Sequence, residues 1–277
     1  MTLSKRFTRK NKRFTVFYGL AIALLFAGIV VIAIDASMQH AAQIRSQQLK
    51  QELKQLYLAA DSSAARSSLT SPIPAGDQAD PQQAASPEAA QAERWERLRA
   101  INPETVGWLR VEGTDIDDPI VQHADNAYYL NVDVAGRRSM YGSIFMDFRS
   151  DFQRTQQNIV IYGHNMLDGS MFGSLQSYKN RTFFDEHRFI SVETPSASTK
   201  WEIFSVYTID AQKDEVDVNY ADEQGLEQAV DGYRKRSLFP GPLLADNPER
   251  LLTLVTCSNE TDDTRLVLHA FPVAGSL

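Results

Sequence analysis

The stretch LLTLVTC at residues 251–257, followed by TRLVLHAF at residues 264–271, decides the fold that we expect for this chain. Both runs are apolar and rich in leucine and β-branched residues, which is typical of buried strands. The seven residues SNETDDT between Cys257 and Arg265 suit a hairpin connection. If the two strands pair antiparallel, Cys257 and Arg265 lie near each other across the turn.

Cys257 is the only cysteine in the chain. A lone cysteine is a free reactive thiol, a link to another chain, or a small buried apolar side chain. Arg265 is equally consistent with an ordinary surface charge. The residues alone leave these alternatives open.

The folded body begins near residue 92 and continues to about residue 274. Helical spacing of apolar residues predicts short helices at 93–101, after Gly169, and at 222–235. Strand-like runs separated by Gly, Asn, Asp and Pro recur through the rest of the body. They are VGWLRVE, IDDPIVQ, SIFMDF, NIVIYG, RFISVE, KWEIFSVYTI, RLLTLVTC and RLVLHAF. Eight strands with few helices predict a mainly β fold, a closed or nearly closed barrel.

A different composition marks the N-terminal part of the chain. Residues 1–13 carry six positive charges, and residues 14–34 form an uncharged run of 21 residues. As a helix this run spans about 30 Å, which predicts a transmembrane anchor with the basic tail in the cytoplasm and the body outside. A cleaved signal peptide is the alternative, but the run is long for one and IDASM is a poor cleavage site. A helical stalk at 35–60 and a flexible linker at 61–91 are expected to follow.

The charge of the body excludes one class of partner. The formal net charge is −7, and removing the six N-terminal cations leaves −7 − 6 = −13 for the remainder. Such an acidic body argues against binding nucleic acid through its phosphates.

His164 is a candidate base at a strand end, although a lone histidine in such a position is more often structural. It ends the strand-like run NIVIYG, whereas His40, His123 and His187 lie in polar settings and His269 belongs to the last strand. The motifs HExxH, CxxC and GxSxG and a Gly-rich phosphate loop are all absent from the sequence, so no metal or cofactor is expected. The remaining cysteine, histidine and arginine suffice for acyl transfer by a thiolate.

These stretches resemble the class B sortases, cysteine transpeptidases of Gram-positive bacteria. The sortase signature T-L-x-T-C with a following arginine corresponds to TLVTC at 253–257 and Arg265. The segments at 101–131, 142–149 and 161–178 are similar to their class B counterparts in the same order. The resemblance covers residues 92–274. It implies an eight-stranded sortase-type barrel with an N-terminal helix and a helix before the seventh strand.

The resemblance also implies the roles of the site residues. As a thiolate, Cys257 attacks the carbonyl of a threonine and forms a thioester. His164 protonates the leaving amine and later accepts a proton from the incoming amine. Arg265 binds the substrate backbone and stabilises the oxyanion, with the backbone N–H of Ser258 as a further donor. The implied substrate-binding residues are Asn126, Leu130, Val255, Thr256 and Ser258.

The function implied is a membrane-anchored transpeptidase that cuts a C-terminal sorting motif after its threonine. Its partners are then a secreted surface protein that carries the motif and an amine of the peptidoglycan cross-bridge. Three alternatives stay open: an enzyme that joins pilins through a lysine amine, an inactive anchored scaffold, and an ordinary cysteine peptidase. The sequence does not reveal the motif, since Val255 and a segment near Glu215 depart from the family pattern.

Overall fold

The computed structural model describes residues 4–69, 87–152, 157–242, 249–257 and 264–273. The chain divides into two compact units, Met1–Gln48 and Leu49–Leu277. The first unit is helical, and the second contains the strands.

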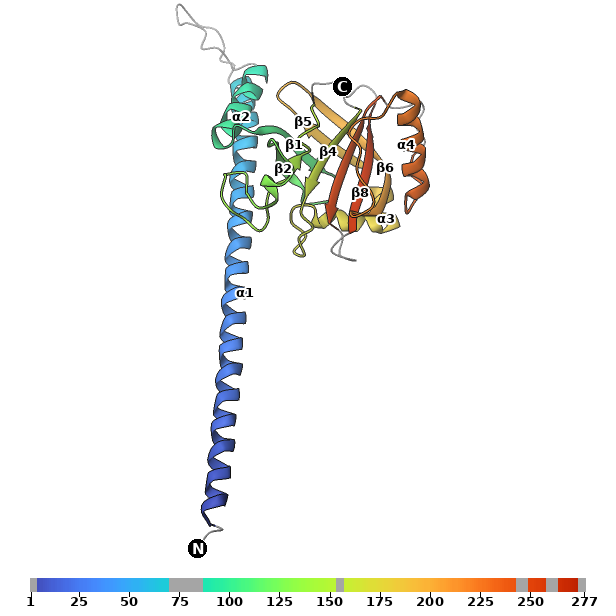
Figure 1. Ribbon diagram of the computed structural model, residues 1–277. Helices are drawn as coiled ribbons and strands as arrows, with labels where there is room; N and C mark the ends of the chain where they lie inside the picture. The colour runs from blue at the N-terminus through green and yellow to red at the C-terminus, as the bar shows by residue number, and fades with distance from the viewer. Residues whose placement is uncertain (1–3, 70–86, 153–156, 243–248, 258–263, 274–277) are drawn as a thin grey trace, which may run out of the picture. The chain divides into compact units, whose positions relative to one another are not determined.

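The elements follow one another in the order drawn in Figure 1. The helices are α1 (Ser4–Leu69), α2 (Pro87–Ile101), α3 (Arg181–Glu186) and α4 (Glu223–Arg236), with the 3-10 helices η1 (Tyr128–Leu130) and η2 (Gly173–Lys179). The strands are β1 (Thr105–Val111), β2 (Asp117–Val121), β3 (Phe145–Met146), β4 (Asn158–Gly163), β5 (Phe189–Glu193), β6 (Ser198–Asp210), β7 (Leu251–Cys257) and β8 (Thr264–Pro272).

The strands in the described part of the chain close into a barrel in the order β1-β2-β3-β4-β7-β8-β6-β5 (Figure 1). Neighbours pair antiparallel except β2 with β3 and β4 with β7, which are parallel. The predicted eight-stranded barrel is therefore confirmed. The parallel pair matters most for function, because it brings the carboxyl end of β4 beside the carboxyl end of β7.

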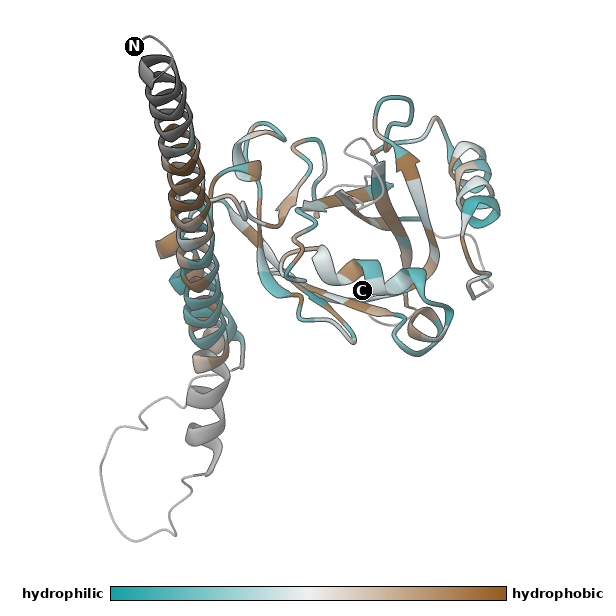
Figure 2. Cartoon of the chain, turned by 90° about the horizontal axis from the view of Figure 1, so that it is seen from below, coloured by the Kyte–Doolittle hydropathy of each residue, from teal (hydrophilic) through white to brown (hydrophobic). Residues whose placement is uncertain are grey.

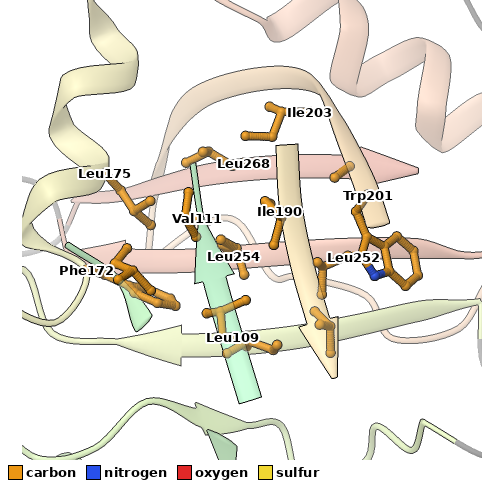
Figure 3. Packing of buried hydrophobic residues seen from close by; sticks show 14 of the residues in the cluster. Leu109, Val111, Phe172, Leu175, Ile190, Trp201, Ile203, Leu252, Leu254 and Leu268 are labelled. Atoms are coloured by element: carbon orange, nitrogen blue, oxygen red, sulfur yellow. The ribbon is translucent and has the colours of Figure 1, made fainter. Parts of the chain in front are cut away.

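Alternation along the last two strands separates the barrel interior from its outer face. The inward residues of β7 and β8 are completely buried in the main core: Leu252, Leu254, Leu266 and Leu268. Figure 3 labels three of them, Leu252, Leu254 and Leu268. The intervening residues Val255 and Val267 belong to a separate apolar cluster on the outer face. Positions 253, 255 and 257 of β7 therefore share the outer face, because successive strand residues alternate between the two faces.

Helix α4 covers another part of the outer face. Leu226 and Val230 of α4 pack with Phe204 of β6 and Leu251 of β7. The helix begins at a side-chain cap, since the Asp222 carboxylate accepts a hydrogen bond of 2.8 Å from the backbone N–H at 225. The predicted helix before the seventh strand is thus confirmed.

The second compact unit begins earlier than the expected start of the body at residue 92. Leu49, Leu53 and Tyr57 are buried in one apolar cluster with Trp95 of α2 and Trp108 of β1. These three α1 residues recur every four positions and so share one side of the helix. Much of the expected stalk at 35–60 is therefore packed into the body from residue 49 onward.

The structure describes both ends of the expected linker at 61–91, and both ends are helical. Its first residues continue α1 to Leu69, and its last residues begin α2 at Pro87. Residues 70–86 lie outside the described part of the chain.

The apolar run of the first unit is helical and exposes its side chains on all sides. Leu24, Leu25 and Phe26 follow one another along the helix, and each is about two-thirds exposed. Figure 2 shows this stretch of α1 in brown. By length and composition the helix is able to cross a membrane, as predicted.

Candidate active site

The last two strands place Cys257 and Arg265 opposite each other. β7 and β8 pair antiparallel, and their register aligns Thr253 with His269, Val255 with Val267, and Cys257 with Arg265. The predicted hairpin pairing is confirmed at the level of the backbone. Arg265 is partly buried, and its Nη1 donates a hydrogen bond of 2.9 Å to the carbonyl of Thr264.

His164 reaches the same place from β4. The parallel pairing of β4 with β7 aligns Gly163 with Thr256, and the next residues along the two strands are His164 and Cys257. Because parallel strands stay in step, these two residues occupy equivalent positions at the carboxyl ends of neighbouring strands. His164, one residue past the end of β4, thus extends the Cys257–Arg265 pair into a row of three residues.

The His164 ring is held by a backbone carbonyl. Its Nε2 lies 2.6 Å from the carbonyl oxygen of Leu130. A carbonyl oxygen only accepts hydrogen bonds, so Nε2 carries the proton of this bond. Nδ1 is then the nitrogen that remains for proton transfer.

The residue before the histidine has to be a glycine. A Cβ at Gly163 would lie 2.7 Å from the ring of Phe172, which is completely buried. The backbone N–H of Phe172 also donates a hydrogen bond of 2.9 Å to the carbonyl of His164. The loop between the two residues turns through Met171, whose φ is 52°. The loop thus holds the backbone of His164 through this hydrogen bond.

Comparison with known proteins assigns the chain to a family. The sortase domain model matches residues 109–273, more than half of the chain. The chain belongs to the sortase family. Sortase B of Listeria monocytogenes is 33% identical over 165 residues, which cover 60% of this chain and 67% of that protein. Sortase B of Staphylococcus aureus is 29% identical over 179 residues, which cover 64% of this chain and 73% of the relative.

Solved structures agree with this assignment. The X-ray structure of Clostridium perfringens sortase B has a TM-score of 0.62 and 33% sequence identity, and the match covers 65% of this chain and 99% of that one. The predicted resemblance to class B sortases is therefore confirmed, and the chain is a sortase transpeptidase. The residues that perform the chemistry are argued below from the geometry.

Two of the predicted substrate-binding residues of this sortase are buried in the strand that carries Cys257. Val255 packs in the outer-face cluster with Val160, Val218 and Val267, and Thr256 is also buried. Val255 shares the outer face with position 257, whereas Thr256 alternates to the other face and pairs with the inward residue Leu266. Their role toward a substrate stays a prediction. Ser258, the third residue predicted to flank the cysteine, lies outside the described part of the chain.

The other two predicted substrate-binding residues lie on the segment between β2 and β3. The Leu130 side chain is exposed, while its carbonyl holds His164 as described above. The Asn126 amide is partly buried and is fixed by the carboxylate of Asp147 and the backbone N–H of Phe148. Sequence reasoning did not find Asp147, although it lies within the quoted segment GSIFMDFR, because the pattern does not reveal which side chains the carboxylate meets.

A buried polar chain lies under the outer face, two rows below the site residues. Nδ1 of His269 lies 2.9 Å from the Thr253 hydroxyl, and its Nε2 lies 2.9 Å from the Tyr207 hydroxyl. The ring also stacks on Tyr233 at a centroid distance of 3.8 Å. Burial lowers the pKa of His269 to about 3, and the charge of Arg236 acts in the same direction. His269 is therefore a satisfied structural histidine, one of the two alternatives that its position in the last strand allowed.

Within the described residues, no group of three or more His, Cys, Asp or Glu side chains is arranged to hold a metal ion. The chemistry proposed below uses the side chains of the row and one backbone N–H.

Proposed function

We propose that this sortase is a membrane-anchored enzyme that cleaves a C-terminal sorting motif after its threonine through a thioester on Cys257. It then transfers the surface protein to an amine of the peptidoglycan cross-bridge. The observation that carries the proposal is the strand register, in which His164 and Cys257 each follow the last aligned pair of β4 and β7, Gly163 with Thr256, and Arg265 pairs with Cys257.

The proposed reaction has two acyl-transfer steps. The Cys257 thiolate attacks the threonine carbonyl, and the electron pair of the C–N bond leaves with the amine, which takes a proton from Nδ1 of the His164 imidazolium. The incoming amine then attacks the thioester and gives a proton to the same nitrogen, while the cysteine leaves as a thiolate. The carbonyl of Leu130 supports this role, because it holds the ring through Nε2 and leaves Nδ1 for the proton.

Both steps pass through a tetrahedral oxyanion that needs hydrogen-bond donors. Arg265 is the proposed charged donor, and the backbone N–H of Ser258 is the proposed second donor. A fixed cation in a partly buried position stabilises developing negative charge more strongly than it would in water.

The proposed topology puts the basic N-terminal tail in the cytoplasm and the catalytic unit outside the membrane. It is supported by six positive charges ahead of the apolar run and by the length of that run. The proposed client is a secreted surface protein with a C-terminal sorting motif.

The catalytic proposal is tested with a panel of fluorogenic sorting peptides, including Asn-Pro-x-Thr-Asn sequences, with and without an added amine. We expect cleavage by the full chain, an aminolysis product when the amine is present, and a peptide–enzyme thioester by mass spectrometry. Cys257→Ala should abolish all three, and His164→Ala and Arg265→Ala should each lower turnover by about a hundredfold or more. Peptide hydrolysis that added amine leaves unchanged would refute transpeptidation, and near-normal turnover of either variant would refute its assigned role.

The topology is tested through the single thiol. A membrane-impermeant maleimide should label Cys257 in intact cells, and Cys257→Ala should remove the label. Labelling that requires permeabilised cells would reverse the proposed orientation.

A further inference from the structure

Asp147 is a completely buried carboxylate at the end of β3, close to the segment that carries Asn126. Its Oδ2 accepts hydrogen bonds from Nδ2 of Asn126 at 2.9 Å and from the Tyr162 hydroxyl at 3.0 Å. A buried carboxylate without partners is costly, so these donors account for its presence there. The same oxygen atom therefore connects the Asn126 segment to β4, the strand that leads directly into His164.

Arg149 keeps this carboxylate charged. Its Nε and Nη2 atoms donate to the two carboxylate oxygens at 2.9 and 2.8 Å, and its backbone N–H donates to Oδ1 at 2.9 Å. Burial alone would raise the pKa of Asp147, but the hydrogen bonds from Arg149, Asn126 and Tyr162 together outweigh it, and the pKa lies below its usual value. Asp147 is thus a fixed acceptor throughout the neutral pH range.

The two partners of Asn126 define which way its amide points. Nδ2 faces the carboxylate, which only accepts, and Oδ1 accepts a hydrogen bond of 3.0 Å from the backbone N–H of Phe148. A flipped amide would put its oxygen against the Asp147 carboxylate and its NH₂ group against an N–H, so the reverse orientation is excluded. The Asn126 amide is left with one N–H and one oxygen lone pair for a further partner, and the positions of this donor and this acceptor are fixed.

We infer that Asp147 is a positioning residue that orients the Asn126 amide to recognise the backbone or side-chain amide of the sorting peptide. This inference rests on the proposed function, since it takes Asn126 as a peptide-binding residue. Asp147 does not touch the peptide, and it acts through Asn126.

The effect should fall on peptide binding rather than on turnover. β4 is held on both sides by its ladders with β3 and β7, so loss of the Tyr162 hydrogen bond leaves His164 in place. Asn126 lies outside the strands, and its amide is oriented by the two bonds described above. Removing the carboxylate therefore releases the amide first.

The test is a double-mutant cycle in the full chain with the fluorogenic Asn-Pro-x-Thr-Asn peptide. Asp147→Asn keeps the volume but removes the charge, and we expect KM to rise about tenfold, as for one lost hydrogen bond, with kcat within about threefold. In the Asn126→Ala background the same change should leave KM nearly unaltered, because the residue through which it acts is gone. A comparable rise of KM in both backgrounds, or a fall in kcat with KM unchanged, would overturn the inference.

Asp133 provides the matched control. It is also buried, and it accepts hydrogen bonds of 2.9 and 3.0 Å from the backbone N–H and Nε of Arg137, whereas the amide of Asn126 bonds to Asp147 and Phe148. Asp133→Asn should lower thermal stability to an extent similar to that of Asp147→Asn and leave KM unchanged. An equal rise of KM in this control would assign the effect to general destabilisation and overturn the inference.

A second measurement separates this inference from the proposed function. If the wild-type chain cleaves no peptide of the panel, the proposed function fails. The inference is then tested by NMR, through the side-chain amide signal of Asn126 in ¹⁵N-asparagine-labelled protein. Asp147→Asn should shift that signal, which Asn126→Asp identifies by its loss, whereas Asp133→Asn should not. An unshifted signal in Asp147→Asn would show that the carboxylate does not orient the amide.

Discussion

Leu53 tests whether the end of α1 is part of the folded body. Its side chain is 2% exposed and lies in the cluster that contains Tyr57, Trp95 and Trp108. Leu58 lies five residues later on the same helix and is 43% exposed. The pair therefore compares a buried and an exposed leucine on one helix with the same substitution.

The expected magnitude follows from the burial. Leu53→Ala removes three carbon atoms from the cluster, each worth about 0.8 kcal/mol of transfer free energy. The cavity that remains adds to this loss, which gives a destabilisation of about 3 kcal/mol, inside the range observed for buried leucines. Leu58→Ala should change the free energy of unfolding by no more than about 0.5 kcal/mol.

The assay is urea unfolding of the full chain, with the same detergent for every variant, and tryptophan fluorescence monitors the unfolding. With an m-value of about 2 kcal/mol per molar, Leu53→Ala should lower the midpoint by about 1.5 M. Leu58→Ala should leave the midpoint almost unchanged. Equal midpoints for the two variants would refute the packing of this segment and restore the reading of residues 35–60 as a stalk.

Three further predictions concern the layers around the site. Gly163→Ala should lower peptide turnover about a hundredfold, because the new Cβ clashes with the Phe172 ring and displaces His164. A near-normal initial rate would show that the loop that carries Phe172 moves to accommodate the Cβ. Burial lowers the pKa of His269 from 6.5 to about 3, so between these values only the unfolded chain binds this proton and acid destabilises the fold. Between pH 7.5 and pH 5, the free energy of unfolding measured with urea should fall by about 2 kcal/mol more in the wild type than in His269→Gln. An equal fall in the two proteins would contradict the neutral buried ring. Thr253→Val should lower the free energy of unfolding by about 1–3 kcal/mol, because it leaves His269 with an unpaired N–H, and an unchanged melting temperature would argue against this bond.

The local pattern of the sequence was sufficient to predict the barrel and its final hairpin. The apolar runs at 251–257 and 264–271 predicted two strands, and their short connection predicted an antiparallel pair with Cys257 near Arg265, which the register confirms. Such predictions succeed because a one-residue shift would turn every buried leucine outward. The hairpin is also short, so the chain itself brings its strands together.

The contact between β4 and β7 has no such local signal. Gly163 and Thr256 are aligned although they lie far apart in the sequence, and parallel pairing across that separation depends on the whole barrel. The place of His164 in the row therefore came from the family resemblance and not from spacing.

The boundary of the body shows a different limit of sequence reasoning. The stripe of Leu49 and Leu53 is narrow, and a narrow stripe predicts an exposed helix. In the structure Tyr57 extends it by stacking on Trp108 at a centroid distance of 4.0 Å, and Lys54 pairs with Asp117 at 2.5 Å. Aromatic and charged contacts complete the interface, and these depend on the partner surface rather than on the helix.

The two histidines on the outer face explain why only one suits proton transfer. Asn158 donates through its amide to the carbonyl of Asp217, so its oxygen accepts from the Thr253 hydroxyl at 2.7 Å. Thr253 then accepts from Nδ1–H of His269, and Nε2 of that ring accepts from the Tyr207 hydroxyl.

Both nitrogens of His269 are therefore committed, the ring is buried, and its lowered pKa keeps it neutral. His164 has only Nε2 committed, to a carbonyl, and the ring is partly exposed at the end of β4. A general acid–base group needs one nitrogen that is accessible to the reacting atoms. The structure thus fixes His269 as a buried structural residue, whereas His164 keeps the accessible nitrogen that its proposed role requires.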